Sequence, residues 1–377
     1  MSEPEDWVDR LTQGADVPQA VITEAADAPR VDYADVPVDD EWELDDEDDE
    51  DEPSRRRRLL FILAIAFVGV ILAGVAGAFF WYLNTGKPVS MLPVLNRTAP
   101  PHYLFSMYDL VQPLGVAVDD ANDRVYVTQS GGDQKVVVFD RAGNKIGNLE
   151  APKGTGKLHV PVYVAVDPKT SDVYVTDRGT STVYVYDSTG GYVRTIVPKG
   201  SNQWTPLGIG FDNAGHVLVT DVSGDVHTLL VMNPDGTVVQ RLGAKEKFEF
   251  PNSVVGDANG DIGVADSNNG RVVIYDSKGG LVGALTRGDA DSPLGLPRGL
   301  AVDDSNRMYV VDASNHTVRV YGHQDPSETT PPKYQFSFGT EGSTDGTFEY
   351  PNGIAVDTKG RLYVTDRENG RLQVWSY

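Results

Sequence analysis

The chain has 377 residues, enough for one or two domains with a substantial core, and it contains no cysteine. Disulfide scaffolds, thiolate metal sites, thiol catalysis and covalent haem attachment through its own residues are therefore excluded. The formal charge of −23 is uneven: residues 1–58 hold 21 acidic and 6 basic side chains (−15), and the remainder holds 34 and 26 (−8). Neither part suits nucleic acid, because phosphate binding requires a basic surface.

Residues 1–58 are rich in Asp, Glu, Ala and Pro and culminate in DDEWELDDEDDEDE (39–52). Such a block repels itself and has little apolar surface to bury, so it predicts a disordered tail that ends in four arginines (55–58). Two short aromatic-containing stretches, around Trp7 and at 33–42, could dock a cytoplasmic partner. A solvated tail with incidental aromatic residues is the alternative.

An apolar segment follows, LLFILAIAFVGVILAGVAGAFFWYL (59–83), whose 25 residues include neither a charge nor a proline. As a helix it would extend roughly 37 Å, more than the ~30 Å hydrocarbon core of a bilayer. The four preceding arginines, against Lys87 and Arg97 after the segment, predict a single-pass anchor with a cytoplasmic N-terminus and an extracytoplasmic remainder. Cleavage as a signal peptide after Ala78 is the alternative. Residues 84–101, with four prolines, predict a short stalk.

Residues 102–377 repeat one pattern six times. Each copy opens with a small, apolar phrase that ends in aspartate, as in LPRGLAVDD and YPNGIAVDT. These aspartates are Asp119, Asp167, Asp212, Asp257, Asp303 and Asp357, spaced 48, 45, 45, 46 and 54 residues apart. Further strand-forming phrases follow, such as RLYVTD, TVYVYD and VVQRLG. A period of this length with four short strands predicts an all-β fold, a six-bladed β-propeller with one blade per copy.

The last copy contains only three strand phrases, whereas an unassigned phrase, HYLFSMYDL (102–110), precedes the first copy. Its pattern matches the fourth-strand phrase KYQFSFG (333–339). An unpaired apolar strand edge favours aggregation, so a partner strand is expected. We therefore predict that residues 102–110 form the outer strand of the sixth blade and close the ring.

The phrase YPNGIAVDTKGRLYVTDRENGRLQVW (350–375) resembles the NHL repeat, and the six copies resemble a complete NHL propeller. Copies four to six carry the resemblance best. The third copy (SGDVHTLLVM) and the first, with Gln129 where the others have aspartate, depart from it. The resemblance implies a binding platform in most cases and a lyase or hydrolase in some related propellers. The arrangement also resembles extracytoplasmic NHL sensor domains of bacterial receptor kinases, without the kinase.

On one face of such a propeller, the loops that lead into the first strands meet the turns between the second and third strands. Residues on this face that differ between blades are the candidate ligand-binding residues: Asn252, Arg298, Asn352, Arg178, Arg367 and Trp204. They predict a polar, partly cationic patch that could hold a carboxylate or an acidic peptide. Ordinary solvated loops are the alternative.

Aspartate recurs at the end of the second strand in five copies: Asp177, Asp221, Asp266, Asp312 and Asp366. A residue repeated in this way is expected to serve the blade by accepting hydrogen bonds from nearby turns. The related amidating lyases imply histidines gathered on zinc in the central channel. Here His159, His227 and His316 lie in different blades, on turns not expected to converge. The phrase DANGD (257–261) lacks the glycine and distal glutamate of a calcium loop and predicts a hairpin turn.

No catalytic residue, metal or cofactor is therefore assigned from the sequence. The chain is expected to be a membrane-anchored extracytoplasmic propeller that binds a protein, peptide or envelope ligand. The alternative is an extracytoplasmic propeller enzyme, such as a metal-dependent lyase or a lactone hydrolase.

Overall fold

The computed structural model describes residues 60, 62–63, 66–70, 72–77, 99–154, 158–200, 203–288, 292–322 and 330–377. The described positions between 60 and 77 are helical. Within this described part of the chain, no helix combines the length and the apolar character needed to cross a membrane. The predicted tail (1–58), much of the predicted span (59–83) and residues 84–98 of the predicted stalk lie outside the described residues.

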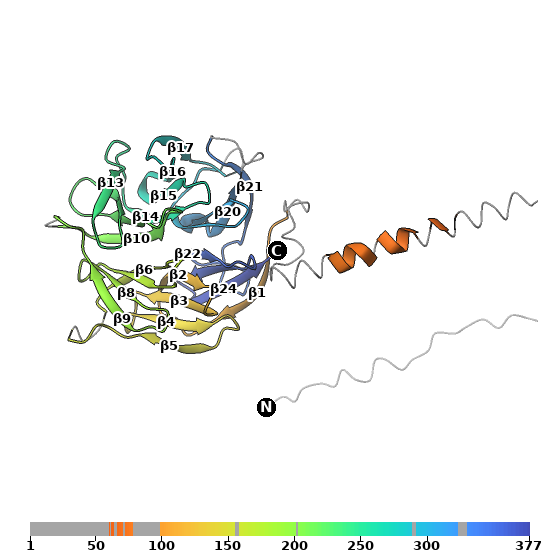
Figure 1. The fold of residues 1–377 in the computed structure, drawn as a ribbon, viewed down its shortest axis with the longest axis horizontal. Coiled ribbons are helices and arrows are strands. Elements are labelled where there is room, and N and C mark those ends of the chain that lie inside the picture. The colour runs from red at the N-terminus through yellow and green to blue at the C-terminus, as the bar shows by residue number, and fades with distance from the viewer. Residues whose placement is uncertain are drawn as a thin grey trace, which may run out of the picture. The chain divides into compact units, whose positions relative to one another are not determined.

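Residues 102–377 form six four-stranded antiparallel sheets, which are the blades of a propeller (Figure 1). The first blade consists of β2 (Pro113–Asp119), β3 (Arg124–Gln129), β4 (Lys135–Asp140) and β5 (Lys145–Leu149). The second consists of β6 (Pro161–Val166), β7 (Val173–Asp177), β8 (Thr182–Tyr186) and β9 (Tyr192–Ile196). The third consists of β10 (Pro206–Phe211), β11 (Val217–Asp221), β12 (Thr228–Met232) and β13 (Val238–Leu242).

The fourth blade consists of β14 (Pro251–Gly256), β15 (Ile262–Asp266), β16 (Arg271–Tyr275) and β17 (Leu281–Leu285). The fifth consists of β18 (Pro297–Val302), β19 (Met308–Asp312), β20 (Thr317–Gly322) and β21 (Lys333–Phe338). The sixth consists of β22 (Pro351–Val356), β23 (Leu362–Asp366), β24 (Arg371–Ser376) and, as its outer strand, β1 (His102–Met107). Each first strand begins at a proline, where the sheet requires no backbone donor.

The predicted ring closure is confirmed. β1 pairs with β24 in antiparallel register, from His102 opposite Ser376 to Met107 opposite Leu372, so orange β1 lies beside blue β24 in Figure 1. The first strands contact their neighbours around the axis, and β22 contacts β2. β1 ends three residues earlier than the predicted strand 102–110, because the chain turns away at Asp109, which has φ 61°.

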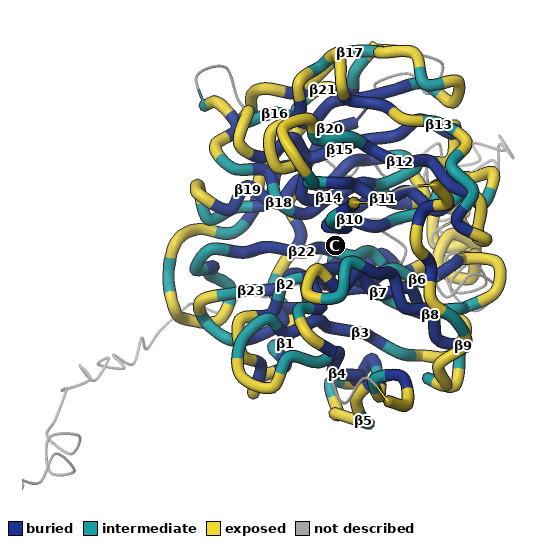
Figure 2. The backbone as a smooth tube through the Cα atoms, turned by 90° about the vertical axis from the view of Figure 1, so that its left-hand side faces the viewer, coloured by how far each residue is buried: buried dark blue, intermediate teal, exposed yellow. Residues whose placement is uncertain are grey.

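The core lies between neighbouring blades rather than at the axis alone. One apolar cluster joins Met107 and Leu372 of the sixth blade to Phe139 of the first. Five comparable clusters join the other strands, so the inner three strands of each blade are largely buried, whereas the outer strands and many turns are exposed (Figure 2). We call each loop that joins two blades an interblade loop. The face formed by the interblade loops and the turns between second and third strands is called the upper face, and the opposite one the lower face.

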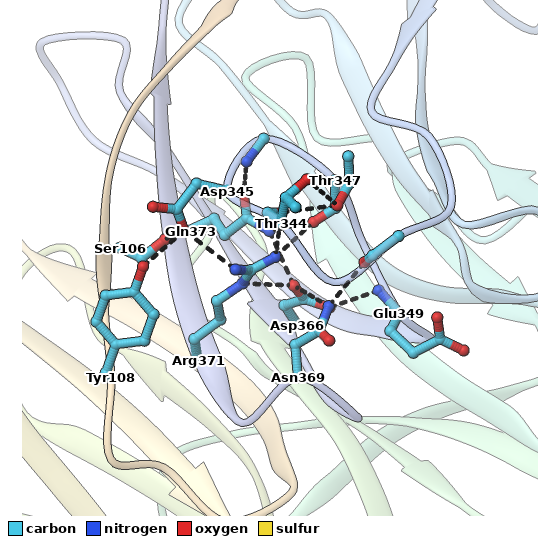
Figure 3. A network of polar contacts seen from close by, with 12 residues as sticks. Ser106, Tyr108, Thr344, Asp345, Thr347, Glu349, Asp366, Asn369, Arg371 and Gln373 are labelled. Atoms are coloured by element: carbon cyan, nitrogen blue, oxygen red, sulfur yellow. Dashed lines mark hydrogen bonds and ion pairs between the residues drawn. The ribbon is translucent and has the colours of Figure 1, made fainter. Parts of the chain in front are cut away.

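The interblade loop 339–350 is held by the closing strand and by the third strand of the sixth blade (Figure 3). Asp345 accepts hydrogen bonds from Ser106 Oγ (3.0 Å) and Tyr108 Oη (2.6 Å). Arg371 pairs with Asp345 (3.0 Å) and with buried Asp366 (2.8 Å). The segment that closes the ring is therefore also bonded to a loop of the upper face.

Candidate functional site

Six equivalent positions, two residues after the proline of each first strand, come close together at the axis. They are Gly115, Tyr163, Gly208, Ser253, Gly299 and Gly353. Glycine is required where neighbouring first strands approach: a Cβ atom at Gly208 would lie 2.5 Å from the carbonyl oxygen of Asn252, and one at Gly299 would lie 2.5 Å from that of Asn352. The bulky side chain at Tyr163 is thus an exception to the repeat.

The Tyr163 side chain crosses the axis. Its hydroxyl donates to the carbonyl oxygen of Arg298 (3.2 Å) in the opposite blade and accepts from Asn352 Nδ2 (3.1 Å) in the sixth blade. Burial raises the pKa of Tyr163 from 10.0 to about 12, and the Arg298 charge and the Asn352 hydrogen bond oppose that shift less strongly. Tyr163 is therefore a neutral hydrogen-bond donor that ties three blades together.

Tyr163 makes folding sensitive to alkaline pH. Its pKa is higher in the folded protein than in the unfolded chain, so the stability that it contributes is complete below pH 10 and is lost as the pH rises toward 12. We expect the free energy of unfolding to fall more steeply between pH 10 and 12 in the wild type than in Tyr163→Phe. Urea titrations at several pH values measure both slopes, and parallel curves would refute the assignment.

The half-buried guanidinium group of Arg298 lies near the axis on the upper face. Its Nη1 donates to Asn252 Oδ1 (3.0 Å), and Asn252 Nδ2 in turn donates to the carbonyl oxygen of Phe250 (3.0 Å) and to Ser267 Oγ (2.7 Å). No carboxylate pairs with Arg298 in the described part of the chain, and its Nε is buried without an acceptor there. By contrast, Arg271 lies 2.7 Å from Asp266.

The other predicted site residues have different surroundings. Asn352 and Trp204 are buried, with 5% and 4% of their surfaces exposed, and Trp204 Nε1 donates to the carbonyl oxygen of Ser181 (2.7 Å). Arg178 is exposed, and Arg367 lies 3.1 Å from Glu368. The structure therefore links Asn252, Arg298 and Asn352 through Tyr163. Among the described residues, no contact joins this group to the other three predicted residues, Arg178, Arg367 and Trp204. Ligand binding by any of the six stays a prediction.

The aspartates at the ends of the second strands hold the interblade loops. Asp177 accepts from the backbone N–H groups of His159 (2.8 Å) and Val160 (3.0 Å). Asp366 accepts from the N–H of Glu349 (2.7 Å) and from Arg371 and Asn369. These contacts agree with the structural interpretation made from the sequence, with the addition that the bonded loop comes from the preceding blade. The phrase at 257–261 forms a hairpin turn, as predicted.

One group of possible metal ligands occurs among the described residues: His316, Glu341 and Glu349, whose ligand atoms lie within 4.8 Å of one another. However, His316 Nδ1 accepts the backbone N–H of Tyr350 (3.2 Å), and in the neutral ring the proton then sits on Nε2. Ligation through Nε2 would move the ring proton to Nδ1 and cost this hydrogen bond, so the contact favours a structural role for His316. The same bond recurs between His227 Nδ1 and the N–H of Phe250 (3.0 Å), which indicates a structural role.

The profile of the NHL repeat matches residues 248–275, 294–321 and 348–375, which belong to the fourth, fifth and sixth blades. The chain thus contains NHL repeats and forms a six-bladed β-propeller. It is similar to NHL repeat-containing protein 3 of Mus musculus, with 29% identity over 44% of this chain and 52% of that protein. It is also similar to the probable peptidyl-alpha-hydroxyglycine alpha-amidating lyase pgal-1 of Caenorhabditis elegans, with 27% identity over 46% of this chain and 55% of that protein.

These alignments span about half the length of the relatives (52% and 55%). Among solved structures, a streptogramin B lyase aligns with a TM-score of 0.50 and 15% identity, over 73% of this chain and 98% of that one. At this identity the likeness concerns the fold alone. The matches confirm that copies four to six carry the NHL resemblance best.

Sequence reasoning selected Asn252, Arg298 and Asn352 as candidate residues but missed Tyr163, which contacts two of them. The pattern that could have revealed Tyr163 was the repeat itself, since four of the six equivalent positions are glycine. A bulky residue at a position where the other blades have no room for a Cβ atom must direct its side chain elsewhere, here across the axis.

Proposed function

We propose that this protein is a binding module whose upper face receives an anionic group of a protein or peptide ligand on Arg298. The observation that carries the proposal is a half-buried guanidinium near the axis with an amide oxygen as its acceptor and no carboxylate partner in the described chain. Charged groups at such depth are ordinarily paired, and residues 59–377 hold an excess of acidic side chains (34 against 26). A carboxylate would complete the pairing in bidentate geometry.

We further propose that residues 59–83 anchor the chain in a membrane, with the N-terminus in the cytoplasm and the propeller outside. This proposal is supported by the uncharged 25-residue segment and by the arginines before it. Apolar side chains within it, such as Phe67 and Val70, are 67% and 71% exposed, which suits an apolar surrounding. The chain enters the propeller at His102, opposite Ser376, at the lower face.

A lyase function is the alternative that the relative from Caenorhabditis elegans raises. Against it, the Tyr163 side chain occupies the axis between the second and fifth blades, where a central reaction centre would need space for substrate. Metal analysis of the purified protein together with a turnover assay separates the two functions. Stoichiometric zinc or calcium that supports turnover would favour the lyase.

The binding proposal is tested with a peptide array that presents each sequence with a free C-terminal carboxylate and with a C-terminal amide. We expect purified protein to bind a subset of the free acids, and Arg298→Gln to lose at least tenfold in affinity. Arg241→Gln is the matched control, because Arg241 is exposed on the outer strand β13. Equal binding by Arg298→Gln and the wild type would rule the proposal out. Asn352 is left intact, since it supports Tyr163.

A further inference from the structure

The turn between the second and third strands of the third blade departs from the repeat on the upper face. It contains six residues (222–227), whereas the equivalent turns of four other blades contain four each: RGTS (178–181), SNNG (267–270), ASNH (313–316) and RENG (367–370). Val226, in the longer turn, is 60% exposed, and Val222 packs only partly against the core of the second and third blades. This turn therefore presents apolar surface where those blades present short, largely polar turns.

The ring of Phe250, which comes directly before β14, lies against the longer turn. It is 40% exposed and meets the ring of His227 edge-on, with 5.3 Å between the centroids. The backbone of Phe250 is left-handed (φ 52°), a conformation that bulky residues rarely adopt. His227 Nδ1 holds it in place by accepting the N–H of Phe250 (3.0 Å). The ring is thus fixed at the surface in the unliganded protein, which lowers the entropy cost of binding to it.

A continuous series of contacts joins this apolar surface to Arg298. Asn252 Oδ1 accepts from Arg298 (3.0 Å), and Asn252 Nδ2 donates to the carbonyl oxygen of Phe250 (3.0 Å). Phe250 in turn contacts His227, which directly follows Val226 in the chain. Arg298, Phe250 and Val226 therefore follow one another across the upper face, from the axis toward the third blade.

An open pocket continues the surface on the other side of the longer turn. The turn contributes Val222 and Ser223 to its wall, and the segments before β10 contribute Val197 and Trp204. Its cavity volume of about 500 Å³ lies within the range of ligand-binding sites. Trp204, one of the residues selected from the sequence, thus lies in the wall of this pocket.

We propose that this surface binds the C-terminal segment of a protein or peptide whose last residues are apolar. The inference rests on the proposed function, because it takes the carboxylate on Arg298 as the end of the ligand chain. An extended chain advances about 3.3 Å per residue, so the residues before the terminus lie over Phe250 and then over Val226. Apolar side chains at these places gain free energy because they and the surface cover each other from water.

The longer turn gives the ligand its direction. A chain that leaves Arg298 toward the third blade meets Phe250, Val226 and the pocket beyond them in that order. Polar side chains in the ligand would cover the same apolar surface without a comparable gain, and they would lose contacts with water. The surface therefore selects among C-terminal sequences, whereas Arg298 alone selects only for the carboxylate.

An array of peptides with free C-terminal carboxylates tests the inference on the purified full chain. Half of the peptides end in Leu, Val or Phe, and each has a partner that is identical except for Ser, Asn or Gln at those places. We expect the wild type to bind the apolar member of a pair about tenfold more tightly. Val226→Ser and Phe250→Asn should each reduce this preference about threefold, and asparagine tolerates the left-handed backbone at 250.

Val239→Ser is the matched control, because Val239 is an equally apolar, 54% exposed residue of the same blade, on the outer strand β13. It should leave the preference unchanged. A preference that survives in both Val226→Ser and Phe250→Asn would overturn the inference. Melting temperatures establish that each variant is folded, and Val226→Ser alone decides the question if Phe250→Asn proves unstable.

Arg298→Gln separates this inference from the proposed function on which it rests. If the wild type binds both members of each pair equally and Arg298→Gln weakens both, the inference is wrong and the carboxylate site stands. If Arg298→Gln binds every peptide as the wild type does, the carboxylate site is wrong and the inference fails with it. Loss of affinity in Arg298→Gln together with loss of preference in Val226→Ser supports both.

Discussion

Replacing Met107 with aspartate is expected to lower the melting temperature of the propeller by about 10 to 20 °C. Met107 is 2% exposed in β1 and packs in the cluster shared by the first and sixth blades. Losing a buried methionine side chain costs about 2–5 kcal/mol, and an unpaired charge in its place adds to that cost. For a domain of this size, 1 kcal/mol corresponds to about 2–4 °C.

Leu104→Asp is the matched control for the closing strand. Leu104 lies in the same strand but is 41% exposed, so the new carboxylate stays in water. We expect a change of less than 3 °C. Tryptophan fluorescence follows both melts, because Trp375 lies opposite Tyr103 of β1. Similar melting temperatures for the two variants would mean that β1 does not close the ring in solution.

Replacing Asp366 with alanine is expected to destabilise the sixth blade by about 3–5 kcal/mol, the usual cost of leaving a buried charge without its partner. Asp366 is fully buried, and it accepts hydrogen bonds from Arg371 (2.8 Å), Gln373 (2.8 Å) and the N–H of Glu349 (2.7 Å). Its loss leaves the Arg371 guanidinium in the interior with Asp345 as the remaining carboxylate. The interblade loop 339–350 also loses its anchor.

Chemical denaturation measures this effect, with Asp235→Ala as the control. Asp235 also pairs with a cation, Lys199 at 2.6 Å, but both side chains are 60% exposed. Exposed pairs contribute little because water screens them, so we expect almost no change in the denaturation midpoint. If Asp366→Ala behaved like the control, the carboxylate would not anchor the loop.

Much of the fold could be predicted because the repeat encodes it directly. The spacing of the aspartates that end the opening phrases predicted six blades. Because the last copy lacks a fourth strand phrase, residues 102–110 were predicted to supply it. Alternating apolar residues set the strands, and a proline marked the start of each first strand. These patterns are local, and each recurs in several copies. A blade with an atypical phrase can therefore still be assigned by comparison with the others.

The candidate site was harder to predict because it depends on contacts across the ring. The bond from Tyr163 to the Arg298 carbonyl joins residues 135 apart in sequence. The positions of Tyr163 and Arg298 in the sequence do not show that the side chain of the first reaches the backbone of the second across the axis. The sequence also did not reveal burial: Trp204 was grouped with arginines of the upper face, although it lies in an apolar cluster and donates to the carbonyl oxygen of Ser181. The exception to the repeat at Tyr163 proved more informative than the repeated residues.

The pairing of β1 with β24 has a consequence for biosynthesis. His102 and its partner Ser376 are 274 residues apart, so a ribosome that adds 5–20 residues per second needs roughly 14 to 55 s between them. Throughout that interval β1 lacks the strand with which it pairs. The propeller must therefore finish assembling after translation of its last blade, and a nascent chain that stalls before β24 cannot yield a closed, protease-resistant product.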